Sequence, residues 1–422
     1  MNLVPAAGGS RMVATPDPVA RDYITLALRL DQHISGLVDG YFGPADLKAT
    51  VDQEQLRAPA RLRDDATALR GRLVAEVDDA DRRAWLDAQL IALETQAGGL
   101  AGETLPYLDY ATRCFAYTPP RYPDATFDAA ATRIGELLPG DAPLADRLAA
   151  WDARFVVPVE RLPGVVDWLV ARFRAQAAAD FGLPEGEDLR VSLVTGQPWS
   201  AYTWFDGGRR SRIDVNIDLP VRASDLIGLV AHEAYPGHHL EHAWKEADLV
   251  DTRGRLESSI LLINTPECLI SEGLGDLGVQ FASPLDGRVD LLVEVFERAG
   301  LSFAADPAAA RDAAELTVAL TDARDRLGAI SGNAAIRRHA DGQSHDEVVT
   351  YLRDVGRYPA DRAEKALEFI EDPLWRTYVF VYAEGEALLR RWLEAVAEPG
   401  RAARFGRLLH EQLTPAAVTV PG

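Results

Sequence analysis

Four of the chain's eight histidines and two glutamates lie within one stretch of eleven residues, HEAYPGHHLEH, from His232 to His242. Imidazole nitrogens and carboxylate oxygens are common ligands of zinc in proteins. In many zinc peptidases the motif H-E-x-x-H places two histidines one helical turn apart, and the glutamate after the first histidine is the general base. The stretch therefore predicts a metal-dependent hydrolytic site, and it can be aligned with such motifs in two registers.

The first register begins at His232 and Glu233, and it has to account for Pro236 and Gly237. On an uninterrupted helix the later histidines lie too far along the axis to share an ion with His232, because each residue adds about 1.5 Å. A Pro-Gly pair breaks a helix, since proline lacks the backbone N–H and clashes with the preceding turn. If the pair loops out, the order His-Glu-Ala-Tyr-His remains, and His232 and His238 become the metal ligands.

The second register aligns HHLEH, from His238 to His242, with the inverted motif H-x-x-E-H, which fits without any distortion. It makes His238 and His242 the ligands and Glu241 the base. It also leaves the preceding His-Glu pair and the Pro-Gly break without a purpose. Because His239 is a further candidate for the second histidine ligand, spacing alone leaves the choice open.

Both registers need another carboxylate, and NTPECLISEGLGDLG supplies Glu272 about two turns into a predicted helix. Thr265 is a good N-cap for this helix, and Pro266 suits its first position. Asp276 follows Glu272 by four residues and shares its helix face, where it can orient a ligand histidine. Structural zinc sites usually have four protein ligands, often cysteines, whereas this region holds only Cys268. The pattern favours a catalytic site.

Together with its flanks, YTWFDGGRRSRIDVNI before it and ISEGLGDLG after it, the histidine stretch resembles the bacterial domain of unknown function 885 family. Members of that family carry H-E-x-x-P-G-H-H and a downstream E-G pair on a helix. The family is related to helical, cleft-bearing zinc peptidases such as the carboxypeptidase Taq and oligopeptidase groups. The resemblance implies peptidase-like chemistry with one Zn²⁺ per chain on His232, His238 and Glu272, and with Glu233 as base. It favours the first register.

The resemblance covers about residues 190–410, and it extends to the N-terminal half only through general helical character. The family's E-G pair is usually followed by Trp-Ala-Leu-Tyr, whereas this chain has LGDL at 274–277. The family's late P-G-Q-A-L segment is replaced here by YAEGEALLRRW, from Tyr382 onward. Both changes alter the expected cleft around the metal, so the family's substrate preference is not carried over.

Amide hydrolysis also needs a hydrogen-bond donor for the developing oxyanion, usually a tyrosine or a histidine. Tyr382 and Tyr378, one turn apart in RTYVFVYAEG, are the first candidates, followed by Tyr358 and His339. The two tyrosines are equally compatible with core aromatics whose hydroxyls find partners.

A predicted strand at residues 212–218 precedes the histidine stretch. In zinc peptidases of this type an edge strand before the metal helix binds an extended peptide by adding it to the sheet. Asn216 on this strand is therefore a predicted substrate-binding residue, and His339 is the second one.

The remaining sequence predicts the helices that position these groups. Apolar residues recur every three to four positions from residue 18 onward, which is the helical period. Only 189–219 breaks this pattern: LRVSLVTG and SRIDVNIDLP are expected to be strands around a turn at FDGGRRS. We expect a mainly α, zincin-like domain with a small β-sheet at about 189–219 beside the metal-binding helix, and a central cleft.

The expected organisation is a disordered tail at 1–17, a helical N-terminal half at 18–188, and a metal-binding catalytic half of the same domain at 189–422. No composition shift marks a border between the halves.

Composition excludes several function classes. The chain has 422 residues and a formal net charge of −21, which repels nucleic acid and anionic membranes. We find no apolar run of about 18 residues and no secretory signal, and two cysteines suit a reducing cytoplasm. We expect a cytoplasmic metallopeptidase-like hydrolase whose partner is a peptide or small amide substrate. A metal-dependent amidase on a non-peptide metabolite, or an inactive metal-binding protein that recognises peptides, are the alternatives.

Overall fold

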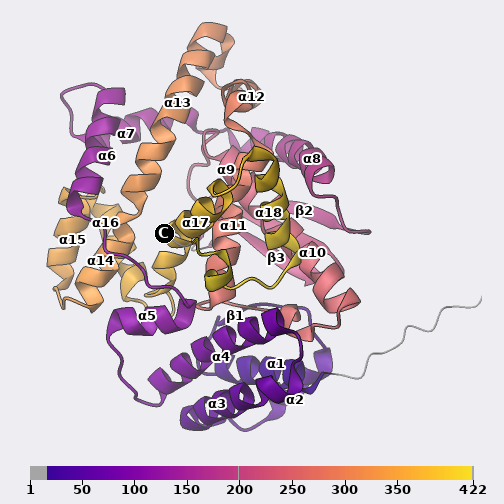
Figure 1. The fold of residues 1–422 in the computed structure, drawn as a ribbon. Helices are drawn as coiled ribbons and strands as arrows, with labels where there is room; N and C mark the ends of the chain where they lie inside the picture. The colour runs from indigo at the N-terminus through magenta and orange to yellow at the C-terminus, as the bar shows by residue number, and fades with distance from the viewer. Residues whose placement is uncertain (1–16, 198, 421–422) are drawn as a thin grey trace, which may run out of the picture.

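Helices dominate the structure, a computed structural model that describes residues 17–197 and 199–420 (Figure 1). The tail predicted at 1–17 lies outside the described residues except for Asp17, whose side chain caps the first helix. This mainly α architecture with small sheets confirms the fold class predicted from the periodicity. The α-helices are α1 (Pro18–Asp31), α2 (Ala45–Gln53), α3 (Pro59–Glu76), α4 (Ala80–Leu100), α5 (Tyr107–Phe115), α6 (Asp124–Leu137), α7 (Leu144–Asp152), α8 (Leu162–Asp180), α9 (Leu226–Glu233), α10 (His238–Lys245), α11 (Pro266–Ala282), α12 (Leu285–Arg298), α13 (Pro307–Gly328), α14 (Ile330–His339), α15 (His345–Asp354), α16 (Ala360–Glu371), α17 (Val381–Glu394) and α18 (Glu398–His410).

Two small sheets accompany the helices among the described residues. In the first, β1 (Val38–Tyr41) pairs antiparallel with β5 (Ile260–Leu262). The second has the strand order β2-β4-β3, from β2 (Asp188–Val194), β3 (Ala201–Gly207) and β4 (Arg210–Asn216). Within it β2 runs parallel to β4, and β3 runs antiparallel to β4. The small sheet predicted at about 189–219 is therefore present, directly before α9.

The course of the chain through this sheet corrects the sequence prediction. FDGGRRS does not connect β2 to β4. It contains the end of β3, a tight turn at Gly208 and Arg209, and the start of β4. Both turn residues have positive φ, 63° and 60°, which suits a two-residue hairpin. Because β3 and β2 flank β4 on its two sides, β4 is the central strand, and the edge next to α9 and α10 belongs to β3.

One continuous cluster of buried apolar residues runs from Val19 near the start of α1 to Val418 near the C-terminus. Figure 1 shows α1 to α4 gathered at one end of the molecule, whereas α9, α11 and α17 lie at its centre. Of the elements that carry the histidine stretch and Glu272, α9 and α11 therefore lie at the centre of the fold.

The helix break at the histidine stretch lies where the sequence predicts it. Helix α9 ends at Glu233 and α10 begins at His238, with Pro236 and Gly237 between them. The Gly237 N–H donates to Ala231 O at 3.0 Å. A Cβ at Gly237 would lie 1.8 Å from the carbonyl oxygen of His232, so the chain can turn this closely only with glycine there. The turn sets α10 against the end of α9.

Helix α11 carries Glu272, and it packs closely on α17 through glycines. Its N-cap is Thr265, whose side chain accepts the Cys268 N–H, with Pro266 at the first position, as predicted. A Cβ at Gly273 would lie 2.4 Å from the carbonyl carbon of Gly385 in α17. This close approach brings the segment before α17 beside Glu272.

Within the described ranges, no helix is both long and apolar enough to span a membrane.

Candidate metal centre

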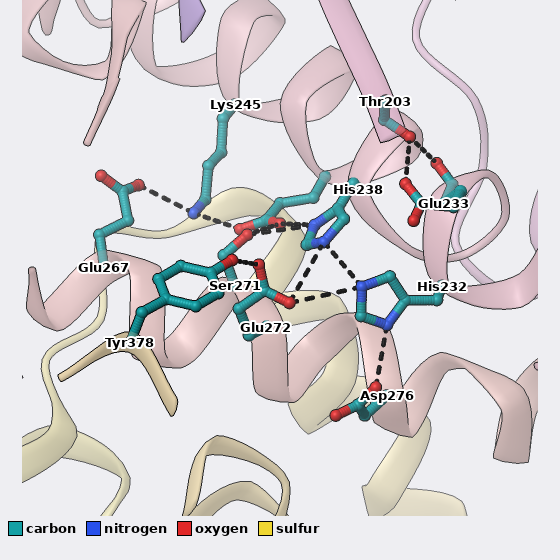
Figure 2. A network of polar contacts seen from close by, with 11 residues as sticks. Thr203, His232, Glu233, His238, Lys245, Glu267, Ser271, Glu272, Asp276 and Tyr378 are labelled. Atoms are coloured by element: carbon teal, nitrogen blue, oxygen red, sulfur yellow. Dashed lines mark hydrogen bonds and ion pairs between the residues drawn. The ribbon is translucent and has the colours of Figure 1, made fainter. Parts of the chain in front are cut away.

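His232, His238 and Glu272 come together at the centre of the fold, from α9, α10 and α11 (Figure 2). The Nε2 atoms of the two histidines lie 3.0 Å apart. Glu272 Oε2 lies 3.4 Å from Nε2 of His232 and 3.8 Å from Nε2 of His238. Three atoms that can bind a metal therefore converge on one point.

These separations fit a single zinc ion. With zinc–ligand distances of about 2.0–2.1 Å, two ligands of a tetrahedral site lie about 3.3 Å apart. Glu272 Oε2 is buried and has no hydrogen-bond partner among the described residues. A buried carboxylate oxygen without a partner is costly, and a cation between it and the two imidazoles removes that cost. The donor set, two nitrogens and one carboxylate oxygen, is that of catalytic zinc sites with an open fourth position.

A contact on the side of the ring away from His238 and Glu272 fixes the orientation of His232. Its Nδ1 lies 2.9 Å from Oδ1 of Asp276, one turn after Glu272 on α11. A proton on Nδ1, donated to this carboxylate, leaves the lone pair of Nε2 pointing at the centre. A Cβ at Gly275 would lie 2.8 Å from the His232 ring, so glycine makes room for the imidazole.

His238 is held by a buried polar chain on its far side. Its Nδ1 lies 3.3 Å from Ser271 Oγ, and the Ser271 hydroxyl donates to Glu241 Oε2 at 2.6 Å. Glu241 Oε1 in turn accepts from Lys245 Nζ at 2.7 Å. The chain keeps the proton of His238 on Nδ1 and its Nε2 toward His232.

Glu272 uses its second oxygen for Tyr378. The Tyr378 hydroxyl donates to Oε1 at 2.6 Å and leaves Oε2 facing the histidines. Burial raises the pKa of the Glu272 carboxyl, but the two histidines outweigh burial and hold this pKa well below its usual range. The group is therefore a carboxylate at neutral pH.

Glu233 follows His232 at the end of α9, and β3 holds it in place. The Thr203 hydroxyl donates to Glu233 Oε2 at 2.6 Å, and it also lies 3.1 Å from the Glu233 carbonyl oxygen (Figure 2). This contact fixes one oxygen of the Glu233 carboxylate.

The inverted register is disfavoured by the surroundings of Glu241. Glu241 and His242 also lie near His238, close enough to form a second possible ligand group. However, Glu241 is 0% exposed, and Lys245 and Ser271 occupy its two oxygens. Such a carboxylate cannot reach a substrate. His242 stacks parallel to His238, and burial lowers its pKa to about 3, so it stays neutral.

Three other predicted residues have partners away from the cluster. The Asn216 amide donates to the carbonyls of Gln197 and Trp199, both at 2.9 Å, because its strand is central and its side chain holds the preceding loop. His339 ends α14 and lies 2.8 Å from the Ile370 carbonyl through Nε2. His239 is fully buried between Ser211 and Glu187. None of these contacts joins the converging triad.

Tyr382 packs against Tyr378, the partner of Glu272. It is 44% exposed, its ring meets that of Tyr378 edge-on at 5.5 Å, and it lines a cavity of about 1610 Å³. Asp276, the partner of His232, lines the same cavity. Burial of the hydroxyl and the nearby Glu272 carboxylate raise the pKa of Tyr382 well above its usual value, so it keeps its proton. The residues that line this cavity include Asp276 but none of the three converging groups, so the central cleft around the metal stays a prediction.

Three residues of this site were absent from the sequence prediction or had no assigned contact there. Lys245 follows Glu241 by four residues, a helical ion-pair spacing that could have revealed it. Ser271 adjoins Glu272 in the sequence, but nothing marked it as polar support. Thr203 comes from β3, which the sequence pattern did not separate from the turn.

Comparison with known proteins leaves the family open. No known family and no curated protein matches the chain. One solved structure is a protein from Colwellia psychrerythraea, provisionally described as a lipoprotein, with 16% identity and a TM-score of 0.49. The alignment covers 84% of this chain and 65% of that one, so the chain spans just under two thirds of its length. Another, from Shewanella oneidensis, provisionally described as a lipoprotein of unknown function, has 11% identity, a TM-score of 0.47 and coverages of 96% and 82%.

Proposed function

We propose that the chain is a zinc-dependent hydrolase of peptide or other amide bonds. One observation carries the proposal: the two Nε2 atoms of His232 and His238 face each other at 3.0 Å, beside Oε2 of Glu272, which is buried and has no hydrogen-bond partner among the described residues. Because Asp276 and Ser271 take up the Nδ1 atoms, two nitrogen lone pairs and a carboxylate oxygen point at one place. Such an arrangement is repulsive unless a cation or a proton lies among them.

His232, His238 and Glu272 would hold the zinc ion. When bound, the ion supplies Lewis-acid chemistry, which lowers the pKa of water and polarises the substrate carbonyl. Glu233 is the general base: Thr203 holds its Oε2, which leaves Oε1 to take a proton from the attacking water. The same carboxyl then gives that proton to the leaving amine.

We assign different roles to Tyr378 and Tyr382, which were both candidate oxyanion donors in the sequence. Tyr378 is committed to Glu272 Oε1 and therefore positions this ligand. Tyr382 is exposed to the cavity and keeps its proton, so its hydroxyl is the donor for the developing oxyanion.

We place the substrate beside β3. This strand lies at the edge of its sheet, and Thr203 in it holds Glu233. An extended peptide added to this edge would pass next to the general base. Asn216 and His339 are not part of this proposal, because their side chains are engaged within the chain.

The first experiment is metal content by mass spectrometry on wild type, His232→Ala and His242→Ala, purified identically. We expect about one zinc per chain in wild type and in His242→Ala, and none in His232→Ala. Loss of zinc in His242→Ala alone would restore the inverted register. If wild type holds no zinc under conditions that load known zinc peptidases, the proposed hydrolase function is rejected.

Catalysis is tested with a library of short peptides on wild type and Glu233→Gln. We expect cleavage by wild type, and at least a 100-fold lower rate for the variant, with its zinc retained. A variant that keeps zinc and full function would instead indicate a peptide-recognition protein. The cytoplasmic location expected from composition stays a prediction, which cell fractionation checks.

A further inference from the structure

Lys245 is a buried lysine that bridges two glutamates on different helices. It is 4% exposed, and its Nζ lies 2.7 Å from Glu241 Oε1 and 3.0 Å from Glu267 Oε1. Glu241 lies one turn earlier on α10, whereas Glu267 lies in the first turn of α11. Lys245 therefore ties the helix that carries His238 to the helix that carries Glu272.

The contacts between α10 and α11 form a ladder that ends at the metal centre (Figure 2). Lys245 and Glu267 make the first step. One turn further along both helices, Glu241 accepts from Ser271. The next step is the approach of His238 to Ser271 and Glu272, at 3.3 Å and 3.8 Å. Each step fixes the spacing of the following one, because both helices are rigid over a single turn.

Three charged side chains buried together cost free energy through desolvation. Replacing such groups by apolar residues often leaves a protein equally stable or makes it more stable, so burial alone does not account for the arrangement. The bridge lies directly behind a candidate zinc ligand, and this position gives a functional reason for the buried charges.

We propose that Lys245 is a positioning residue of the metal centre. By bridging Glu241 and Glu267 it holds α10 at the distance from α11 at which His238 and Glu272 can share one zinc ion. It also keeps Glu241 in place as the end of the hydrogen-bond chain from Nδ1 of His238. This inference rests on the proposed function, since it concerns the affinity of the same site for zinc.

The chain contains a matched control for the structural effect of removing such a group. Arg82 likewise bridges two carboxylates, those of Asp17 and Glu257, at 2.5 Å and 2.6 Å, and its side chain is 14% exposed. It shares no hydrogen bond or ion pair with the metal centre among the described residues. Removing Arg82 should therefore loosen the fold without changing the spacing of the ligands.

The test compares full-length wild type, Lys245→Met and Arg82→Met. Zinc affinity is measured by competition with a chromogenic chelator, and thermal stability is measured on the metal-free proteins. We expect zinc affinity to fall at least tenfold in Lys245→Met, within the range of about 10–100-fold that outer partners of zinc ligands contribute. We expect Arg82→Met to stay within twofold of wild type, although its stability falls. The visible spectrum of bound Co²⁺ should change only in Lys245→Met.

Two results would overturn the inference while the proposed function stands: a folded Lys245→Met with wild-type zinc affinity, or equal losses of affinity in both variants. If Lys245→Met does not fold, Glu267→Leu replaces it, because leucine cannot accept from Lys245 Nζ; this substitution cuts the bridge to α11 and keeps the pair with Glu241. We expect at least a threefold loss of affinity there, and an unchanged value would overturn the inference. Wild type that binds no zinc would reject the proposed function, and the inference with it.

Discussion

Each candidate ligand at the centre has one polar atom bound by the protein and one left free. A group engaged on one side is fixed in direction, so its other atom can only point at the common centre. The engaged pairs are Nδ1 of His232 with Asp276, Nδ1 of His238 with Ser271, and Oε1 of Glu272 with Tyr378. The three free atoms are therefore held in the arrangement that the proposed zinc ion requires.

Substitutions of Tyr378 and Tyr382 should affect different properties of the protein. Tyr378→Phe removes a donor to a zinc ligand, so we expect about tenfold weaker zinc binding and nearly normal kcat when zinc is saturating. Tyr382→Phe removes the oxyanion donor, so we expect kcat to fall about 100- to 1000-fold with unchanged zinc affinity. Chelator competition and steady-state kinetics measure the two effects. Equal effects on both quantities in the two variants would contradict this division.

The sequence could supply part of this residue-level arrangement. His232 and Glu233 belong to a motif with fixed spacing, Glu272 follows on a predicted helix, and the family resemblance favoured His238 as the second histidine. Thr203 could not be foreseen, because its contact with Glu233 joins residues 30 positions apart. Such a contact depends on tertiary packing, which periodicity does not report.

At the level of elements, the turn between α9 and α10 decides whether two histidines meet. The pair Pro236 and Gly237 predicted this break, because proline and glycine act on the local backbone conformation. Strand β3 was not predicted, and the turn FDGGRRS was expected to join β2 to β4, because strand order depends on long-range contacts: β2 and β4 are neighbours, yet β3 lies between them in the chain. The pairing of β1 with β5 joins residues more than 200 positions apart and left no signal in the sequence.

Gly237→Ala tests this turn. The added Cβ would lie 1.8 Å from His232 O and 2.5 Å from Ala231 O, so the backbone has to move. We expect a loss of stability of about 1–3 kcal/mol and at least a tenfold loss of zinc affinity. Gly228→Ala in α9, where a Cβ meets nothing within 4 Å, is the matched control and should be neutral or slightly stabilising. Denaturant unfolding and chelator competition measure both variants.

A group of polar contacts around Glu187 joins α10 to the segment before β2. Glu187 accepts from Tyr235 at 2.5 Å and lies 3.0 Å from Nε2 of His239, and it pairs with Arg174 on α8. Burial raises the pKa of Glu187, but His239, Tyr235 and Arg174 outweigh burial and lower it to about 2.

This shift has a definite consequence for acid stability. A carboxyl whose pKa is lower in the folded state than in the unfolded state stabilises the fold above the unfolded value, about 4.3. That contribution is lost as pH falls from about 4.3 to about 2, because the group must then take up a proton. We expect Glu187→Gln to be less stable at pH 7 and to lose less stability across this window than wild type. Urea unfolding at a series of pH values measures the slope, and parallel slopes would contradict the assignment.

For the whole molecule, the candidate metal centre joins α9, α10 and α11, which together span residues 226–282, and α9 and α11 lie at the centre of the fold (Figure 1). A ligand that binds only the folded chain stabilises it by an amount that grows with its free concentration relative to Kd. At a thousandfold excess over Kd the gain is about 4 kcal/mol.

Removing zinc with a chelator should therefore lower Tm by several degrees, and adding zinc back should restore it. His232→Ala should show no response to either treatment, because its site lacks a ligand. The Tm of His242→Ala should respond as in wild type, since that residue lies outside the triad; an unresponsive His242→Ala beside a responsive His232→Ala would place the ion in the inverted register instead.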